Sequence, residues 1–235
     1  MASIQPEPPL HRAHRQRLST RRVVDEALAM IDEHGMAAVT MRGLAARLGV
    51  EAMSLYKHVP SRGKLFDAVV DRIVDELTED PAVTRAPVAG WRPYLAGIAH
   101  GIRRYARAHP NAFPLVATRP TEAPWINPPL RSVAWIEAFL AGLRSEGFTD
   151  AQILFAYRTF NSFLLGFLLM ETSAMTTQVP VPPDGPQATI DEARYPTIHR
   201  LADGLSEDHF VAEFEAGLHA MLDQIDARLH AILNR

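Results

Sequence analysis

Apolar side chains recur every three to four residues over most of this 235-residue chain. That spacing is typical of amphipathic helices, and we find no strict alternation of the kind that half-buried strands show. The pattern therefore predicts an all-α fold without internal repeats. The expected helices lie at about residues 20–34, 41–48, 51–58, 62–80, 91–109, 130–146, 150–175 and 206–233.

Capping residues mark where these helices begin and end. A hydroxyl at the first position accepts an otherwise unpaired backbone N–H, and the residues suited to this role are Ser19 or Thr20, Thr40 and Ser61. Gly35 is suited to end the first helix, and Gly49 supplies the positive φ that a sharp turn needs. Clusters of proline and glycine predict non-helical joints at 81–90, 113–124 and 178–187.

The net charge of −3 hides an uneven distribution. Residues 1–64 hold 10 Lys and Arg against 6 Asp and Glu, whereas residues 65–235 hold 14 against 21. The asymmetry predicts a small basic domain on a larger acidic one, with chance scatter as the alternative. We divide the chain into an arm (residues 1–18), a head (residues 19–80) and a trunk (residues 91–235).

The longest apolar run, Phe163 to Met170 with Gly166 inside it, is far shorter than the roughly 20 residues that cross a bilayer. The chain has no cysteine, which excludes disulfides and thiolate metal sites and fits a reducing compartment. The arm lacks the apolar run of a secretion signal. We expect a cytoplasmic protein that does not enter a membrane.

The stretch from Thr40 to Lys64 carries the pattern most closely tied to chemistry. It holds two short helices joined by a tight turn at Gly49, and a further helix begins after Ser61. Two short helices at a steep angle form the unit that places one helix in the major groove of DNA. Leu55 is expected to anchor that helix inward. The stretch therefore predicts a helix-turn-helix DNA-binding domain.

The candidate DNA contacts differ in what they can read. Ala52 and Met53 are suited to contact a thymine methyl group, while Arg42 is suited to donate two hydrogen bonds to guanine O6 and N7. Phosphate contacts position a protein without reading sequence, and they need polar or cationic groups. The candidates for that role are Ser54, which also suits a base, Tyr56 and Lys57. We interpret Arg47 as an ordinary surface residue.

Arg62 and Lys64 stand in the first turn of the fourth helix, where each cation opposes the helix dipole by a few tenths to about 1 kcal/mol. A phosphate bound at this helix end would explain their placement. The alternative is that both side chains are solvated and nearly neutral in energy. The arm leaves a similar choice open, because its arginines either contact DNA or belong to an inert tail.

The head resembles the tetracycline-repressor (TetR) family over residues 19–77. The similarity rests on Val39-Thr40-Met41-Arg42-Gly43-Leu44-Ala45, Leu48-Gly49-Val50 and Leu55-Tyr56-Lys57-His58-Val59. A weaker similarity of the trunk to the tetracycline repressor's own class rests on Trp91, Arg103-Arg104, Thr118-Arg119-Pro120-Thr121-Glu122 and Tyr195-Pro196-Thr197.

The resemblance implies a homodimeric, all-helical transcriptional regulator, usually a repressor, that a small molecule releases from a double-stranded DNA operator. It implies base contacts by Arg42, Ala52 and Met53. The implied phosphate contacts are Thr40, Ser54, Tyr56, Lys57 and Arg62, to which Lys64 is added from its position.

The chain departs from the family pattern where tetracycline repressors bind their drug. Leu115 stands in place of a magnesium-binding histidine, Ile98 and Ile102 in place of an asparagine and a phenylalanine, and Thr78 in place of a pocket histidine. We therefore expect an apolar or amphipathic effector rather than a tetracycline–magnesium chelate. Ala52-Met53 replaces a Gln-Pro pair, which predicts a different operator.

Two long helices of the trunk, at 150–175 and 206–233, carry more apolar surface than one core layer needs. A second copy would complete a four-helix bundle with twofold symmetry, and the small residues Ala216, Gly217 and Ala220 would permit close approach. The alternative is that both helices form the core of a monomer.

The effector pocket is harder to predict, because side chains that line pockets also fill cores. The candidate contacts are Ile98, Ile102, Leu115, Thr118, Arg119, Trp135, Phe160 and Phe163. Arg103, Arg104 and Arg158 either hold an anionic ligand or lie at the surface. The trunk histidines lack the tight spacing of metal ligands, so we predict no metal site.

Two other functions compete with this prediction. One is a helical small-molecule-binding protein or enzyme without sequence-specific DNA binding. No Gly-rich phosphate loop or nucleophile–base pair stands out, so we expect no catalytic residue and no cofactor. The other is a packaging protein that binds all DNA sequences alike, against which the acidic trunk argues.

Overall fold

The computed structural model describes residues 17–84, 87, 89–119, 123, 125–126, 132–176 and 183–233. These residues form helices and connecting turns, with no β-strand within those ranges, which confirms the predicted all-α class. Most of the predicted arm, residues 1–16, lies outside the described residues.

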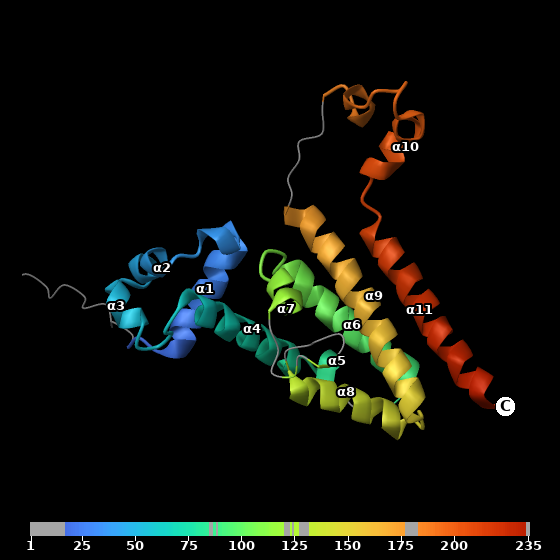
Figure 1. Cartoon of the computed structure of the whole chain (residues 1–235), viewed down its shortest axis with the longest axis horizontal. Helices are drawn as coiled ribbons and strands as arrows, with labels where there is room; N and C mark the ends of the chain where they lie inside the picture. The colour runs from blue at the N-terminus through green and yellow to red at the C-terminus, as the bar shows by residue number, and fades with distance from the viewer. Residues whose placement is uncertain are drawn as a thin grey trace, which may run out of the picture.

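The head consists of α1 (Thr20–His34), a 3-10 turn η1 (Met36–Ala38), α2 (Met41–Leu48), α3 (Ala52–Leu55) and α4 (Arg62–Glu79). Figure 1 shows α1, α2 and α3 at one end of the molecule, with α4 running from them into the trunk. Their apolar faces close over one core, in which Ile31, Leu44, Leu55 and Leu65 are fully buried. Leu55 is thus the inward anchor that the sequence predicts.

The predicted caps define the boundaries of the head helices. The hydroxyl oxygens of Ser19, Thr40 and Ser61 accept backbone N–H groups three residues later, at 3.0 to 3.2 Å. Gly49 adopts φ 67° and ψ 35°, the left-handed conformation that a side chain disfavours. This turn sets the angle between α2 and α3, as the sequence predicts.

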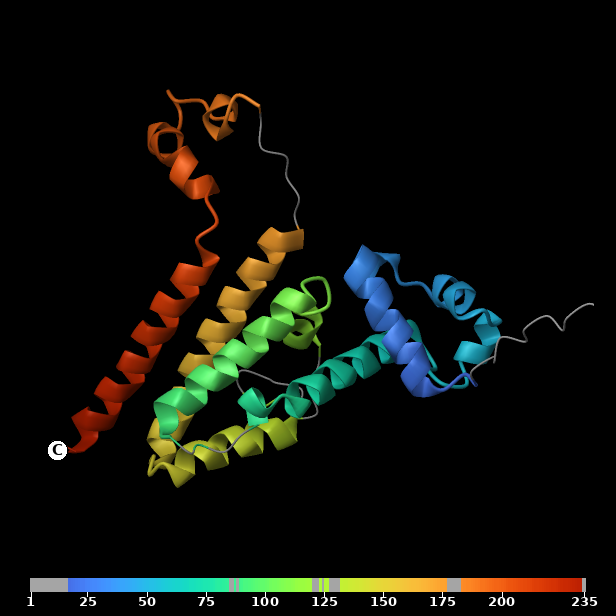
Figure 2. The same ribbon diagram turned by 180° about the vertical axis from the view of Figure 1, so that it is seen from behind.

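The trunk consists of α5 (Pro81–Thr84), α6 (Trp91–Ala108), α7 (Pro114–Thr118), α8 (Val133–Ser145), α9 (Asp150–Thr176), a 3-10 turn η2 (Pro186–Thr189), α10 (Pro196–Ser206) and α11 (Phe210–Leu233). The central helix is α9, which packs against α6, α8 and α11 around Phe139, Phe160, Leu164 and Phe214. Figures 1 and 2 show α9 and α11 side by side, with α10 and η2 standing off one end of the pair.

By length and composition alone, α9 is apolar enough to span a membrane. In the structure it lies in the trunk core, and it carries the buried polar residues Asn161 and Glu171 on its inward side. Its place in the trunk core accounts for the apolar residues on its inward side, whereas Leu154 and Met170 are exposed.

The structure differs from the predicted elements at several points. α3 ends at Leu55 rather than His58, and the chain continues as a turn. The last helix begins at Phe210, and α5, α7 and α10 occupy segments in which we predicted no helix. Each of these three short helices begins with a proline. Proline suits the first helical position, because its missing N–H would have no partner there.

Candidate nucleic-acid interface and ligand pocket

The helix-turn-helix unit presents its predicted contact residues to solvent. Met53 is 73% exposed and Tyr56 is 43% exposed, whereas Leu55 between them is fully buried. Ala52 and Ser54 are half-buried. The remaining predicted contacts, all exposed, are Thr40, Arg42, Lys57, Arg62 and Lys64. These side chains can meet another molecule without disturbing the core of the head.

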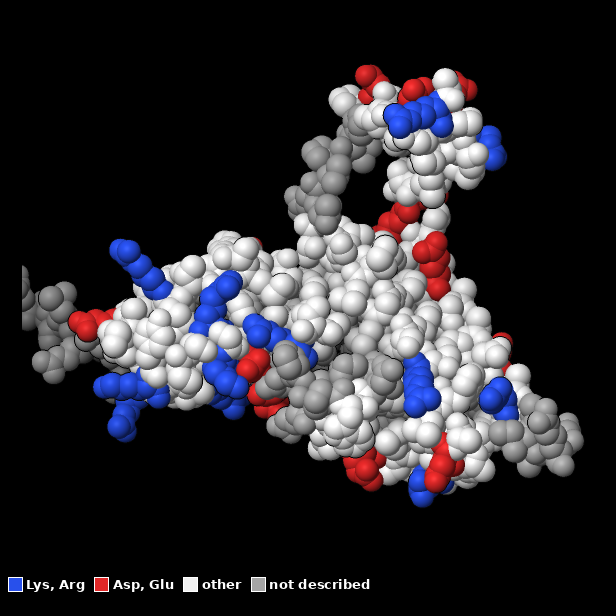
Figure 3. Space-filling model, viewed as in Figure 1, with Lys and Arg blue, Asp and Glu red and all other residues white. Residues whose placement is uncertain are grey.

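Arg42 and Lys57 are the cations of this unit best placed to bind another molecule. Neither makes a hydrogen bond or an ion pair within the part of the chain that the structure describes. Figure 3 shows Lys and Arg side chains projecting from the head on several sides. A guanidinium and an ammonium without internal partners are suited to a base edge and a phosphate, respectively.

Arg62, by contrast, is already bound within the head. Its Nε donates to the carbonyl oxygen of Val39 at 2.7 Å, and its Nη2 donates to that of Met36 at 2.9 Å. The guanidinium also lies over the ring of Phe66, 4.7 Å from its centroid. Arg62 therefore fixes the segment that leads into α2, a role that the sequence did not indicate, and has fewer N–H groups left for phosphate.

Lys64 and Arg47 of the head have acidic partners. Lys64 Nζ lies 3.3 Å from Asp67, so its place at the helix start does not require a bound anion. Arg47, which we interpreted as an ordinary surface residue, bridges α2 to α1 by donating to Glu26 at 2.6 Å and to Glu33 at 2.5 Å. The hydrogen bonds that Arg47 donates to Glu33 and Glu26 raise its pKa, which keeps the bridge charged.

Two adjoining cavities lie where α4 meets α5 and α8. The wider one has a volume of about 590 Å³ and the narrower one about 60 Å³. Both are lined by Val74 and Thr78 of α4, Val83 of α5, Ser132 and Trp135. The lining is mostly apolar, and a cavity of this kind suits a small organic ligand.

The predicted effector contacts fall into separate places. Ile102 and Trp135 line the cavities. Ile98 and Phe160 are buried in the trunk core, and Leu115 is buried in the head core, against which α7 packs.

The other three predicted contacts also lie away from the cavity lining. Phe163 lies between α9 and α11, with its ring 6.1 Å from that of Phe214. Thr118 donates to the carbonyl of Pro114 at 2.9 Å, while Arg119 lies 3.6 Å from Asp67. Thr118 therefore bonds within α7 and Arg119 connects the end of α7 with α4, and neither forms the cavity wall.

Sequence reasoning missed Phe113 and Asn161, which line the narrower cavity. Asn161 carried a usable signal, because an amide in the middle of a long apolar helix needs a reason to be there. Its Nδ2 donates to the carbonyl of Tyr157 at 2.7 Å. Burial raises the pKa of the Tyr157 hydroxyl to about 12. Nothing in the sequence around Phe113 distinguishes a residue that lines a cavity from one that is packed in the core.

The end of α6 is fastened to the head by a polar cluster. His109 Nδ1 lies 2.7 Å from Asp32 Oδ2, and Asn111 donates to the carbonyl of Asp32 at 2.9 Å. Tyr105 donates to Glu76 of α4 at 2.9 Å and stacks on His109, with ring centroids 4.5 Å apart. Burial raises the pKa of Asp32, and the hydrogen bond to His109 opposes that rise. The cluster ties α1 and α4 to the trunk.

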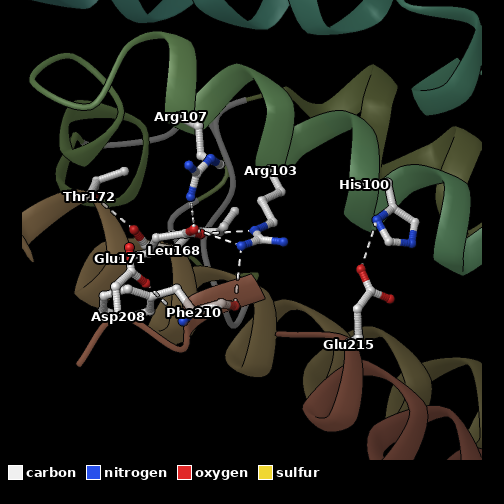
Figure 4. A network of polar contacts seen from close by, with 9 residues as sticks. All are labelled: His100, Arg103, Arg107, Leu168, Glu171, Thr172, Asp208, Phe210 and Glu215. Atoms are coloured by element: carbon white, nitrogen blue, oxygen red, sulfur yellow. Dashed lines mark hydrogen bonds and ion pairs between the residues drawn. The ribbon is translucent and has the colours of Figure 1, made fainter. Parts of the chain in front are cut away.

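A second polar cluster holds α6, α9 and α11 together (Figure 4). Glu171 is fully buried and accepts from Arg103 Nε at 3.0 Å, Arg103 Nη2 at 2.7 Å and Arg107 Nη1 at 2.5 Å. Arg103 also donates to the carbonyl of Phe210 at 3.2 Å and lies 4.4 Å from the ring centroid of Phe214. Arg103 is therefore a buried residue whose guanidinium is bound within the trunk, and not a surface residue.

The described residues contain no group of three or more His, Asp or Glu side chains that could hold a metal ion. An exposed helix-turn-helix, with Arg42 and Lys57 unpaired among the described residues and with α4 running from it into a trunk that has apolar cavities, is the arrangement of a DNA-binding protein with a ligand-binding domain.

Comparisons with known proteins identify the class. The family model described as "Bacterial regulatory proteins, tetR family" matches residues 23–69. The model described as "Tetracyclin repressor-like, C-terminal domain" matches residues 85–229. The chain therefore belongs to the TetR family, whose members are transcriptional regulators and not enzymes.

Individual relatives extend over nearly the whole chain. The HTH-type transcriptional repressor DrrR1 of Streptomyces coeruleorubidus is 28% identical over 226 residues, which cover 89% of this chain and 77% of DrrR1. The tetracycline repressor protein class D of Escherichia coli is 28% identical over 222 residues, or 92% and 93% of the two chains. The crystal structure of Streptomyces coelicolor ActR in complex with actinorhodin matches with a TM-score of 0.68 at 25% identity, covering 90% of this chain and 98% of ActR.

Proposed function

We propose that this regulator is a cytoplasmic repressor that binds a palindromic operator as a homodimer and releases it when a small apolar or amphipathic effector enters the trunk. Two observations together support the proposal. Arg42 and Lys57 are exposed and have no partner among the described residues, and α4 of the same head lines a cavity. We assign base reading to Arg42, Ala52 and Met53.

The outward faces of α9 and α11 support a dimer. Leu154 and Met170 of α9 are exposed, as are the small residues Ala216 and Ala220 of α11. A second copy packed on this surface would cover the apolar side chains and complete a four-helix bundle.

Gly217 has a different role from the one that the sequence suggested. A Cβ placed there would lie 2.7 Å from the ring of Phe163 in the same chain. Its small size therefore lets α11 approach α9 within one subunit, and close approach by a second copy is left to Ala216 and Ala220.

The composition of the cavities supports an effector other than a tetracycline–magnesium chelate. Thr78, which stands where the family pattern has a pocket histidine, lines both cavities. Leu115 and Ile98 contribute no polar group and are buried in the two cores. Ile102 adds an apolar wall. An effector in this lining gains mainly by burying apolar surface.

α4 gives the effector a route to the head. It lines both cavities with Val74 and Thr78, and its other end begins at Arg62, directly after the turn that follows α3. A ligand that binds one dimer geometry better than the other shifts the spacing of the two recognition helices. Half-sites must lie about 34–36 Å apart, and a coupling of about 1–3 kcal/mol changes operator affinity roughly 5- to 150-fold.

Selection of bound sequences from random DNA tests this function. We expect a palindrome whose half-sites are one helical turn apart, and sedimentation should give the mass of a dimer in the absence of DNA. Binding that is independent of sequence would favour a packaging role. A failure to bind any DNA would favour a small-molecule-binding protein without an operator.

A further inference from the structure

We infer that the effector is a lipophilic cation, an aromatic or alicyclic ammonium compound whose charge is held by Asp75 of α4 while its apolar body lies against Trp135 and Tyr94. The inference rests on the proposed function, since it names the chemistry of the molecule that the trunk would sense. It goes further in assigning a charge to that molecule and a residue that selects it.

The lining of the wider cavity combines aromatic rings with one charge. Tyr94, Trp135 and Phe139 contribute rings, and Asp75 is the charged residue of this lining as far as the structure describes it. The faces of aromatic rings carry partial negative charge and attract ammonium groups within about 6 Å. A carboxylate beside such rings is a poor site for a neutral ligand and a worse one for an anion.

Asp75 has no internal partner to neutralise it. It is exposed and makes no side-chain hydrogen bond or ion pair within the described part of the chain. The arginine nearest in sequence, Arg72, is bound to Asp25 at 2.9 Å and to Glu76 at 2.7 Å. The carboxylate at the cavity is therefore available to a cation from outside.

The sequence of α4 strengthens the negative potential at this point. Asp71 and Glu79 lie one turn before and one turn after Asp75. Like charges four residues apart on a helix destabilise it by a few tenths of a kcal/mol per pair, and a bound cation relieves that repulsion. The mouth of the wider cavity thus favours positive charge.

The cluster of basic residues on α6 does not offset this preference. A separate cavity of about 240 Å³ is lined by His100, Arg103, Arg104 and Arg107. None of these four residues lines the two cavities at α4. Arg103 and Arg107 bind Glu171, and Arg104 Nη2 donates to Asp80 at 2.6 Å. An anionic effector in the wider cavity would meet Asp75 without a compensating cation from this cluster.

The position of Asp75 also gives the contact a consequence. Asp75 belongs to α4, which carries the head, whereas Trp135 and Tyr94 belong to α8 and α6. A cation bound between Asp75 and the two rings therefore attracts α4 toward α6 and α8 of the trunk. A neutral ligand of the same shape would bind the rings without attracting Asp75 of α4.

A matched pair of probes tests the inference: 2-(2-naphthyl)ethylammonium and its neutral N-acetyl derivative. Calorimetry would measure the affinity of both probes for the full chain and for Asp75→Asn. We expect the wild type to bind the ammonium probe about three- to tenfold more tightly than the neutral one. In Asp75→Asn the ratio should fall close to one, with the affinity for the neutral probe unchanged.

Glu79→Gln is the control. Glu79 lies one turn after Asp75 and does not line either cavity, so this variant removes the same charge outside the binding site. It should keep most of the preference for the cation. If Asp75→Asn does not fold, Asp75→Ser takes its place, and Trp135→Leu provides a second variant that should also reduce the preference.

The inference is overturned if the wild type binds both probes equally, if the ammonium probe fails to bind at millimolar concentration, or if Glu79→Gln acts like Asp75→Asn. Operator binding by the same proteins separates this result from the proposed function. A protein that binds a selected palindrome but does not distinguish the probes refutes only the charge of the effector. A protein that distinguishes the probes but binds no DNA refutes only the repressor.

Discussion

Arg42 in the head and Arg103 in the trunk carry the same charge in opposite surroundings. Arg42 is exposed and has no partner among the described residues. Arg103 is 7% exposed and donates two hydrogen bonds to the buried carboxylate of Glu171. Burying a charge costs several kcal/mol unless it is paired, whereas an exposed charge avoids this cost. The head thus leaves its charge available to another molecule, while the trunk uses its charge to hold helices together.

Exposed binding cations and bound structural cations are not simply divided between the head and the trunk. Arg62 and Arg47 belong to the head, yet both are bound to other parts of it, Arg62 to two carbonyls and Arg47 to two carboxylates. Residue type and position in a motif therefore do not separate a binding cation from a structural one. What separates them is whether a partner already lies within reach in the folded chain.

The largest expected effect comes from removing the partner of the buried cation. Glu171→Gln leaves Arg103 inside the trunk without a counter-charge, so the free energy of unfolding should fall by about 3–5 kcal/mol in urea titrations. The double variant Arg103→Met with Glu171→Met should recover most of this loss, because an apolar pair of similar volume needs no desolvation. A single variant as stable as wild type would mean that the pair is solvated.

The packing of the trunk around that pair predicts the next effect. Gly217→Ala places a methyl group 2.7 Å from the ring of Phe163, and such overpacking lowers the free energy of unfolding by about 1–3 kcal/mol. Gly204→Ala in α10 is the control, since no heavy atom lies within 4 Å of its Cβ position. Equal thermal stability of the two variants would show that α9 and α11 separate without cost.

The exposed cation should show the opposite behaviour. Arg42→Ala should leave the melting temperature unchanged but weaken operator binding by about 1–3 kcal/mol and relax the preference at one base pair. Binding titrations against the selected palindrome and its single-base variants measure both effects. A fall in melting temperature would place Arg42 among the structural cations and break the comparison.

Lys57→Ala sharpens the comparison within the head. It should weaken binding to all sequences alike and lower the slope of log affinity against log salt by about one, because one phosphate contact is lost. Arg62→Ala is the matched variant, and it should lower the stability of the head by removing two hydrogen bonds to backbone carbonyls. The assignment fails if the two variants have the same effect on melting and on the salt slope.

The smallest effect concerns the junction between the two regions. Burial raises the pKa of Asp32 above its usual 3.8, so ionisation of this carboxyl destabilises the folded state. Asp32→Asn should equal wild type in stability below pH 3.8. Its advantage should then grow as the pH rises through the raised pKa. Thermal unfolding from acidic to neutral pH measures the difference. A neutral-pH advantage for wild type would mean that the contact with His109 outweighs burial.

The head was more predictable from the sequence than the trunk, and the reason is the range of its interactions. The caps at Thr40 and Ser61 bond to residues three positions away, and Gly49 acts on its own backbone. Local patterns of this kind are visible in the chain. Arg62 shows the limit, because its acceptors at Met36 and Val39 are more than 20 residues distant.

The trunk depends on contacts that span the chain. Glu171 directly follows an apolar run in the sequence, and nothing local marks its role because its partner Arg103 is 68 residues away. The cavity wall at Phe113 has the same apolar character as the core residue Phe160. The prolines that begin α5 and α7 lie in segments that we predicted to be non-helical joints, although proline is favoured at the first helical position.

The unbroken length of α4 turns a small rotation into a large displacement. Its 18 residues, Arg62 to Glu79, span about 27 Å at 1.5 Å per residue, and Thr78 near its C-terminal end lines the cavities. A tilt of roughly 2° about the cavity end would carry the far end by about 1 Å. A bidentate contact to a base tolerates only a few tenths of an ångström. Because α4 acts as a lever, movements of less than one bond length at the pocket are enough to change the affinity for DNA.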